Sequence, residues 1–403
     1  NSTADDNTAV GDRALFNNTT GANNSAFGHD ALKANTTANN NTAFGFQALL
    51  DNTTGTDNVA MGVLALENNT TGANNVGIGR EALGANTTAN NNTAVGYAAL
   101  LSNTTGTQNV GIGTLALVAN TTAIENVAIG AEALEACTTG SSNTAVGMRA
   151  LEANTTAASN TAVGVFALGV NTTGTENTAV GANALDANTT ASNNSAFGRM
   201  ALSANTTGTN NTGLGHQALI GNTTGNQNTA VGKDALAANT TASFNTAVGR
   251  EAAKNVTTGS QNTAVGRTAL VACTTGVDNV SVGFNSNGNV TTGNRNVAIG
   301  SGANGDGTTG SNNVVIGFNS ELSAVGSENE IVMGDTVTGV GNSNFTFGVG
   351  STDSNIAFGA TSITAPSDVR LKEDIQDEKV GLDFINDLRP VTFQWKKEKD
   401  IPS

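Results

Sequence analysis

The sequence is poor in the residue types that build an ordinary globular core. Of its 403 residues only 4% are aromatic and 12% charged, and it holds a single Trp and three Pro. A core of large interlocking side chains is therefore not expected. No apolar run reaches the roughly 18 to 20 residues of a membrane-spanning helix, so we expect no membrane insertion. The chain opens on polar residues in mid-repeat and shows no signal peptide, so we expect a longer protein upstream.

Positive charge is also scarce. The 17 Lys and Arg face 32 Asp and Glu, a net charge of -15, and no basic run along the sequence offsets them. Nucleic acids and anionic membranes are therefore not expected partners.

Cysteine and histidine are too rare and too far apart to form a site. Cys137 and Cys273 are eight periods of 17 residues apart, which is about 38 Å at roughly 4.8 Å per coil and beyond the reach of a disulfide. The only two histidines, His29 and His216, are eleven periods apart. We predict no metal site and no cofactor.

Glycine, by contrast, is abundant and regularly spaced. Of the 49 Gly, 20 recur every 17 residues from Gly11 to Gly334 without an insertion; we call these the marker glycines. A period this strict is typical of a solenoid, in which each unit buries its apolar face against its neighbours. The sequence predicts an all-β protein, a parallel β-solenoid or β-roll with one 17-residue coil per repeat.

A short strand is predicted just before each marker glycine. The residue next to the glycine is apolar, as in Val10 and Phe27, and Thr or Val usually stands two residues earlier. The residue between them is nearly always Ala or Gly. The alternation predicts that the first and third residues of the strand point into the coil. The small middle residue would then face outward and press against a second surface, such as a neighbouring chain. The Ala-Leu pair after the glycine, such as Ala82 and Leu83, is predicted as strand or extended turn, with a helical turn as the alternative.

Asparagine and threonine also recur once per coil. Asn stands four residues before each marker glycine from Asn7 to Asn313, and a second row includes Asn35. Asn tolerates a left-handed backbone and bonds nearby amides, so both rows are predicted to form corners. Two alternatives stay open: the Asn-Thr-Thr segments satisfy the glycosylation pattern, and pairs such as Thr36 and Thr37 could bind ice, although only one Thr per coil would be displayed.

The two positions after each marker glycine vary strongly. They hold residues as different as Asp12, Arg80, Tyr97, Arg199 and His216. This mixture indicates a solvated face, and contact of that face with a receptor or glycan is the sharper hypothesis.

The composition changes near residue 366. All three prolines and the only Trp lie in the last 38 residues, where charged residues also become dense. We therefore divide the chain into a repeat shaft at 1–334, a neck of transition strands at 335–366, and the start of a small α+β domain at 367–403.

Two resemblances add to this picture. The segment Asn126 to Gly130, Asn-Val-Ala-Ile-Gly, resembles the head repeats of trimeric autotransporter adhesins, which implies a parallel β-roll in which three chains associate. The segment from Ser367 to Ile375, together with Leu388 to Phe393, resembles the opening of the peptidase S74 intramolecular chaperone domain. That family terminates phage tail fibres and tailspikes, helps three chains wind together, and then cuts itself off.

The second resemblance implies a catalytic pair. Ser367 matches the nucleophile and Lys372 the base, while Asp368 and Arg370 match the motif around them. A serine hydroxyl attacks a carbonyl once a base removes its proton, and a lysine can serve when burial lowers its pKa. We expect at most a single-turnover autoproteolysis beside Ser367; the alternative is that Ser367 caps a helix.

The expected function follows from both parts. The chain is predicted to be the shaft of a phage tail fibre, a homotrimer on the virion tail that meets a glycan or protein receptor on the host cell surface. A trimeric adhesin on a bacterial surface is the alternative, and an ice-binding solenoid comes third.

Overall fold

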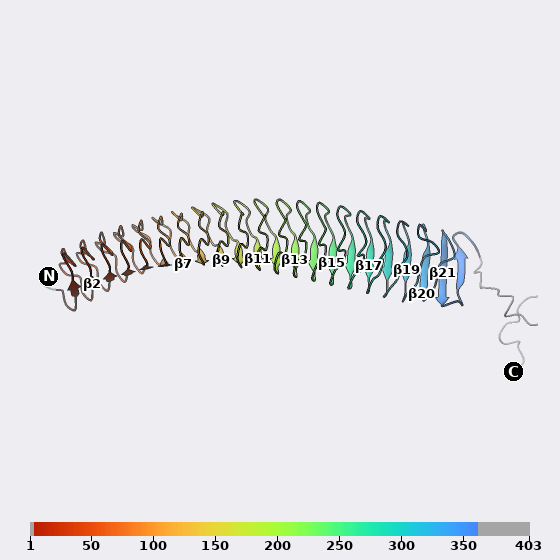
Figure 1. Ribbon diagram of the computed structural model, residues 1–403, viewed down its shortest axis with the longest axis horizontal. Coiled ribbons are helices and arrows are strands. Elements are labelled where there is room, and N and C mark those ends of the chain that lie inside the picture. The colour runs from red at the N-terminus through yellow and green to blue at the C-terminus, as the bar shows by residue number, and fades with distance from the viewer. Residues whose placement is uncertain (1–3, 362–403) are drawn as a thin grey trace, which may run out of the picture. The chain divides into compact units, whose positions relative to one another are not determined.

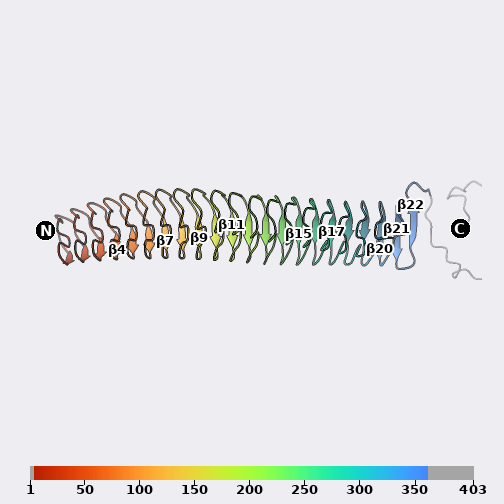
Figure 2. The same cartoon turned by 45° about the horizontal axis from the view of Figure 1, so that its top comes forward.

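The computed structural model describes residues 4–361. The chain divides into two units, Asn1–Thr364 and Ala365–Ser403, and the described residues belong to the first. Coils of this unit stack one on the next along a single axis (Figures 1 and 2). The strands are β1 Thr8–Val10, β2 Ser25–Phe27, β3 Thr42–Phe44, β4 Val59–Met61, β5 Val76–Ile78, β6 Thr93–Val95, β7 Val110–Ile112, β8 Val127–Ile129, β9 Thr144–Val146, β10 Thr161–Val163, β11 Thr178–Val180, β12 Ser195–Phe197, β13 Thr212–Leu214, β14 Thr229–Val231, β15 Thr246–Val248, β16 Thr263–Val265, β17 Val280–Val282, β18 Val297–Ile299, β19 Val314–Ile316, β20 Ile331–Asp335, β21 Asn344–Val349 and β22 Ser354–Ala357.

Each strand from β1 to β19 pairs in parallel with the next one along the chain. Thr161 lies opposite Thr178 and Val163 opposite Val180, a shift of 17 residues. One repeat is therefore one coil, and the predicted all-β parallel solenoid of 17-residue coils is confirmed. Within the described part of the chain, no helix is long and apolar enough to cross a membrane.

The orientation predicted for the strand residues is wrong. The middle residue points inward: Ala26, Ala43 and Ala60 are fully buried. The two flanking residues of each strand, Thr, Ser or Val on one side and an apolar residue on the other, point outward, and Phe44 is 56% exposed. The interior is too narrow for the two larger residues that flank the middle one, because a leucine such as Leu66 reaches beneath the next strand. Even a methyl group added to Gly77 would lie 3.2 Å from Cγ of Leu66.

The Ala-Leu segment forms tight turns. Asp30 and Leu32 both have a left-handed backbone, with φ of 58° and 50°, and positive φ at alternate residues interrupts a strand and a helix alike. The amide of Leu32 donates to the carbonyl of Ala48 in the following coil, at 3.0 Å. These turns place the leucines in the core, where they are the largest fully buried side chains.

The marker glycines are required where coils approach each other. Gly147 has φ of 135°, and a Cβ on it would lie 2.6 Å from the carbonyl oxygen of Gly164 in the next coil. No side chain fits in that space, which explains the unbroken period.

The two asparagine rows bind neighbouring coils together, as predicted for structural corners. In the first row, Oδ1 of Asn177 accepts the backbone amide of Asn194 at 3.0 Å. In the second row, Nδ2 of Asn188 donates to Oδ1 of Asn171 at 2.9 Å. Both rows are buried, so the core consists of Ala, Leu and hydrogen-bonded Asn amides, which accounts for a stable coil without aromatic side chains.

The regular stack changes after β20. Ile331 of β20 lies opposite Phe345 of β21, a shift of 14 residues. Next, β22 pairs antiparallel with β21, with Phe345 opposite Ile356. Strands β21 and β22 lie in the region predicted as a neck, 335–366, whereas β20 is the last strand of the predicted shaft.

Candidate functional site

The predicted catalytic residues Ser367 and Lys372, with Asp368 and Arg370, lie outside the described residues. The helix and strand expected in 367–403 lie outside them as well. The candidate surfaces below therefore belong to the solenoid, residues 4–361.

Both cysteines are buried and unpaired. Each replaces an Asn of the second row: Sγ of Cys137 contacts the carbonyl of Gly140 at 3.2 Å, and that of Cys273 contacts Gly276 at 3.7 Å. Burial raises the thiol pKa of each to about 11. Such thiols are poor nucleophiles at neutral pH, which agrees with the interpretation of the cysteines as substitutions in the repeat.

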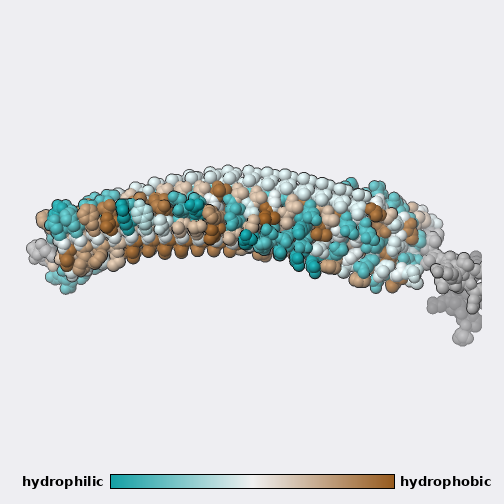
Figure 3. Space-filling view, viewed as in Figure 1, coloured by the Kyte–Doolittle hydropathy of each residue, from teal (hydrophilic) through white to brown (hydrophobic). Residues whose placement is uncertain are grey.

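The most extensive surface is a line of exposed apolar side chains. The residue before each marker glycine points outward, and we call this line, from Val10 to Met333, the apolar row. Its most exposed members are Val10, Phe44, Met61, Ile112, Ile129, Phe197, Leu214, Val248, Val265, Ile299 and Met333. Neighbouring rings touch, with the centroids of Phe27 and Phe44 5.5 Å apart. Figure 3 shows apolar residues along the lower edge of the N-terminal half.

The same outward face contains no charge. None of the strands β1 to β19 includes a charged residue, and their outer flanks are Thr, Ser or Val. The parallel sheet is therefore covered by the core on one side and left open on the other. Parallel sheets are usually covered on both faces, so this face suits association with another polypeptide.

A second surface follows the residue directly after each marker glycine. Five consecutive coils carry a basic residue at this position. We call these residues the basic row: Arg199, His216, Lys233, Arg250 and Arg267. All are exposed except His216, which is half-buried. The members are 17 residues apart in the sequence, so a search for a continuous basic run misses them. The sequence contains no basic run, but stacking of the coils brings these residues together on one face.

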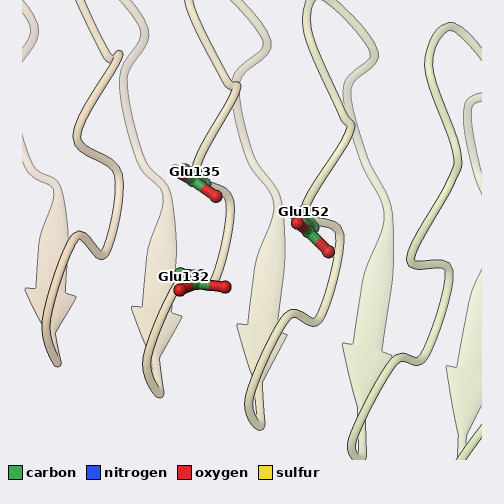
Figure 4. A group of neighbouring side chains, drawn as sticks. All are labelled: Glu132, Glu135 and Glu152. Carbon is green, nitrogen blue, oxygen red and sulfur yellow. The ribbon is translucent and has the colours of Figure 1, made fainter.

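Three glutamates form an acidic group on another stretch (Figure 4). Carboxylate oxygens of Glu132, Glu135 and Glu152 lie within 4.8 Å of one another. The guanidinium of Arg149 contacts Glu132 and lies 3.9 Å from Glu152. Burial, and then the charges of Glu132 and Glu152, raise the pKa of Glu135. Because Arg149 already supplies a countercharge, the arrangement is explained without a metal ion.

The comparisons with known proteins bear on the C-terminal segment. Residues 367–402 match the model of the peptidase S74 family, described as the chaperone of endosialidase. The C-terminal segment is therefore similar to that chaperone family. The match begins at Ser367, the residue at which the motif was expected to start, and it includes Asp368, Arg370 and Lys372.

The endosialidase chaperone match concerns this segment alone. No curated protein and no solved structure matches the chain, so the likeness of the repeats to autotransporter adhesins stays a resemblance. A β-solenoid together with an endosialidase chaperone segment fits a tail-fibre or tailspike-like protein, and the combination suggests a trimeric fibre-type protein.

Proposed function

We propose that the chain is the shaft of a phage tail fibre in which three copies pack along their apolar rows. The chaperone segment assists this assembly and is then released by cleavage beside Ser367. The variable face of the assembled shaft meets the receptor on the host cell.

The observation that carries this proposal is the open, uncharged face of the parallel sheet. Three residues of strand are about 10 Å long and twenty coils stack to about 95 Å, so the face offers on the order of 950 Å² per chain. A stable interface buries about 800 Å² per partner. The face is large enough for a stable association, and leaving it in water would expose an apolar patch larger than monomeric proteins usually carry.

The periodicity of the face favours further copies of the same chain as partners. Each coil from β1 to β19 presents one apolar side chain beside one outward Thr, Ser or Val, and any second copy repeats with the same rise per coil. Two parallel copies in register can therefore interlock over their whole length, whereas an unrelated surface would match only a few coils.

The cleavage step is simple acyl transfer. Lys372 Nζ takes the proton of Ser367 Oγ, the oxygen attacks the carbonyl carbon of the adjacent peptide bond, and an ester forms as the C–N bond breaks. The proton passes to the departing amine, and water hydrolyses the ester to restore the hydroxyl. A single turnover suffices, because the segment has then been released.

Light scattering on protein expressed from the complete gene tests the assembly. We expect one species with three times the mass of a single chain, stable on dilution. A monodisperse monomer with intact β-structure by circular dichroism would refute the proposal.

A further inference from the structure

The basic row stands apart from the charge of the rest of the solenoid. Residues 187–277 hold five Lys or Arg and only two Asp or Glu, in a chain of net charge -15. Four of the five cations belong to the basic row, and the fifth is Lys254. Figure 3 shows hydrophilic residues gathered over the coils between β12 and β16. Four of the ten Lys and Arg of residues 1–334 thus lie in this one line.

Backbone hydrogen bonds fix the register of this line. The carbonyl of Arg199 accepts the amide of Gln217 at 3.1 Å, and the carbonyl of Arg250 accepts that of Thr268 at 3.0 Å. The same bond joins each coil of the row to the next. Successive Cα atoms of the row are therefore one coil apart, about 4.8 Å, and five members span roughly 19 Å.

The charges of the row are only partly neutralised within the chain. Lys233 lies 3.7 Å from Asp234 and Arg250 lies 3.2 Å from Glu251. Among the described residues no ion pair includes Arg199 or Arg267. Like charges one coil apart, such as Lys233 and Arg250, repel each other, so this part of the row costs stability unless a ligand of opposite charge relieves it.

An aromatic ring continues the row in the following coil. Phe284 occupies the next equivalent position, is 51% exposed, and has the guanidinium of Arg267 5.6 Å from its ring centroid. A line of cations ending in an exposed ring can hold both the acidic groups and the apolar face of a sugar chain.

We propose that the basic row binds a linear acidic polysaccharide, with a carboxylate or sulfate on successive sugars lying against successive coils. One sugar ring of an extended chain is similar in length to one coil, so the two periodicities match. The row is a single file with Asp234 and Glu251 directly beside it. This disfavours a nucleic acid duplex, because its second strand would find these two carboxylates rather than a second line of cations. The inference rests on the proposed receptor-binding role and specifies its ligand class.

The test uses the full chain and defined oligosaccharides. Oligogalacturonate and chondroitin sulfate oligosaccharides are titrated by fluorescence anisotropy at low salt, with neutral dextran and a single-stranded oligonucleotide as comparisons. We expect the acidic oligosaccharides to bind and dextran not to bind. Replacing Arg199 and Arg267 by Ser should weaken binding about tenfold and reduce the slope of log affinity against log salt by about 1 to 2.

A matched pair of arginines controls for net charge. Arg80 and Arg295 are exposed, and Arg80 also lies near an aromatic ring, 5.9 Å from the centre of Tyr97. The double variant Arg80→Ser, Arg295→Ser should retain the affinity. Equal losses in both double variants, no binding of acidic oligosaccharides, or tighter binding of the oligonucleotide would each overturn the inference. Light scattering on the same samples reports trimer formation separately, so failure of one proposal is distinguishable from failure of the other.

Discussion

Nδ2 of Asn120 donates to Oδ1 of Asn103 in the preceding coil, 2.7 Å away, while Oδ1 of Asn120 is buried without a hydrogen-bond partner. In an intact row that oxygen would accept from the next Asn, but the next coil carries Cys137. Cys137 thus interrupts the hydrogen-bonded row. The oxygen of Asn120 that is left unpaired is a defect that a single substitution can correct.

Restoring the row should stabilise the solenoid. Cys137→Asn places a donor next to Oδ1 of Asn120, and satisfying a buried acceptor is worth about 1 kcal/mol. We expect a higher Tm by calorimetry. Cys273→Asn is the matched control, because the adjacent coils hold Val256 and Val290 at the equivalent positions. The prediction fails if both variants gain equally.

Charge on the apolar row should prevent assembly without unfolding the coils. Ile129 and Ile299 are both 39% exposed. In the double variant Ile129→Asp, Ile299→Asp each carboxylate would be buried between chains, at a cost of about 2 kcal/mol, or roughly thirtyfold in the association constant. Light scattering should show dissociation at concentrations where the parent protein is trimeric.

The control for that variant carries the same charges elsewhere on the coils. Ile124 and Val165 are 39% and 41% exposed but lie off the apolar row. Ile124→Asp with Val165→Asp should leave the mass unchanged. Dissociation of both double variants would instead indicate a general effect of added charge.

Cleavage should depend on two residues of the chaperone segment. Mass spectrometry of protein from the complete gene should find a cut beside Ser367 in the parent, and essentially none in Ser367→Ala or Lys372→Ala. Ser362→Ala and Lys379→Ala should cleave normally. A cut that persists in both Ser367→Ala and Lys372→Ala would exclude the catalytic pair.

The acidic group of Figure 4 should give a pH-dependent stability. The pKa of Glu135 is raised above 4.5 by burial and by its neighbours, so the folded protein keeps a proton that the unfolded chain has lost. Stability from this group is therefore lost as pH rises from about 4.5 through the raised pKa. Glu135→Gln should raise Tm at neutral pH and change it little below about pH 4.

Glu132→Gln provides the comparison for Glu135→Gln. It removes the partner of the Arg149 guanidinium, so it should give no gain in Tm at neutral pH. A gain of equal size would show that reduced negative charge, rather than the particular surroundings of Glu135, is responsible.

The repeat itself was predictable because every coil needs the same residue types at the same positions, such as Gly where coils approach closely and Asn at the buried corners. The marker glycines, the Asn rows and the replacement of Asn by Cys137 and Cys273 were all assigned correctly in structural terms. The direction of the strand residues was not, because alternation states only that neighbours face opposite ways. Which pair faces inward depends on how far leucines such as Leu66 reach across the coil.

The sequence by itself determined a parallel solenoid of 17-residue coils and the chaperone segment at Ser367, because a strict period and a contiguous motif are both properties of chain order. Only the tertiary structure decided that Ala lines the interior, that the apolar row is left open, and that Arg199 and Arg267 belong to one line of charge. These features arise from stacking, which places residues 17 positions apart in neighbouring coils. The buried leucines then occupy most of the interior of each coil, so only a small residue such as Ala fits at the inward strand position.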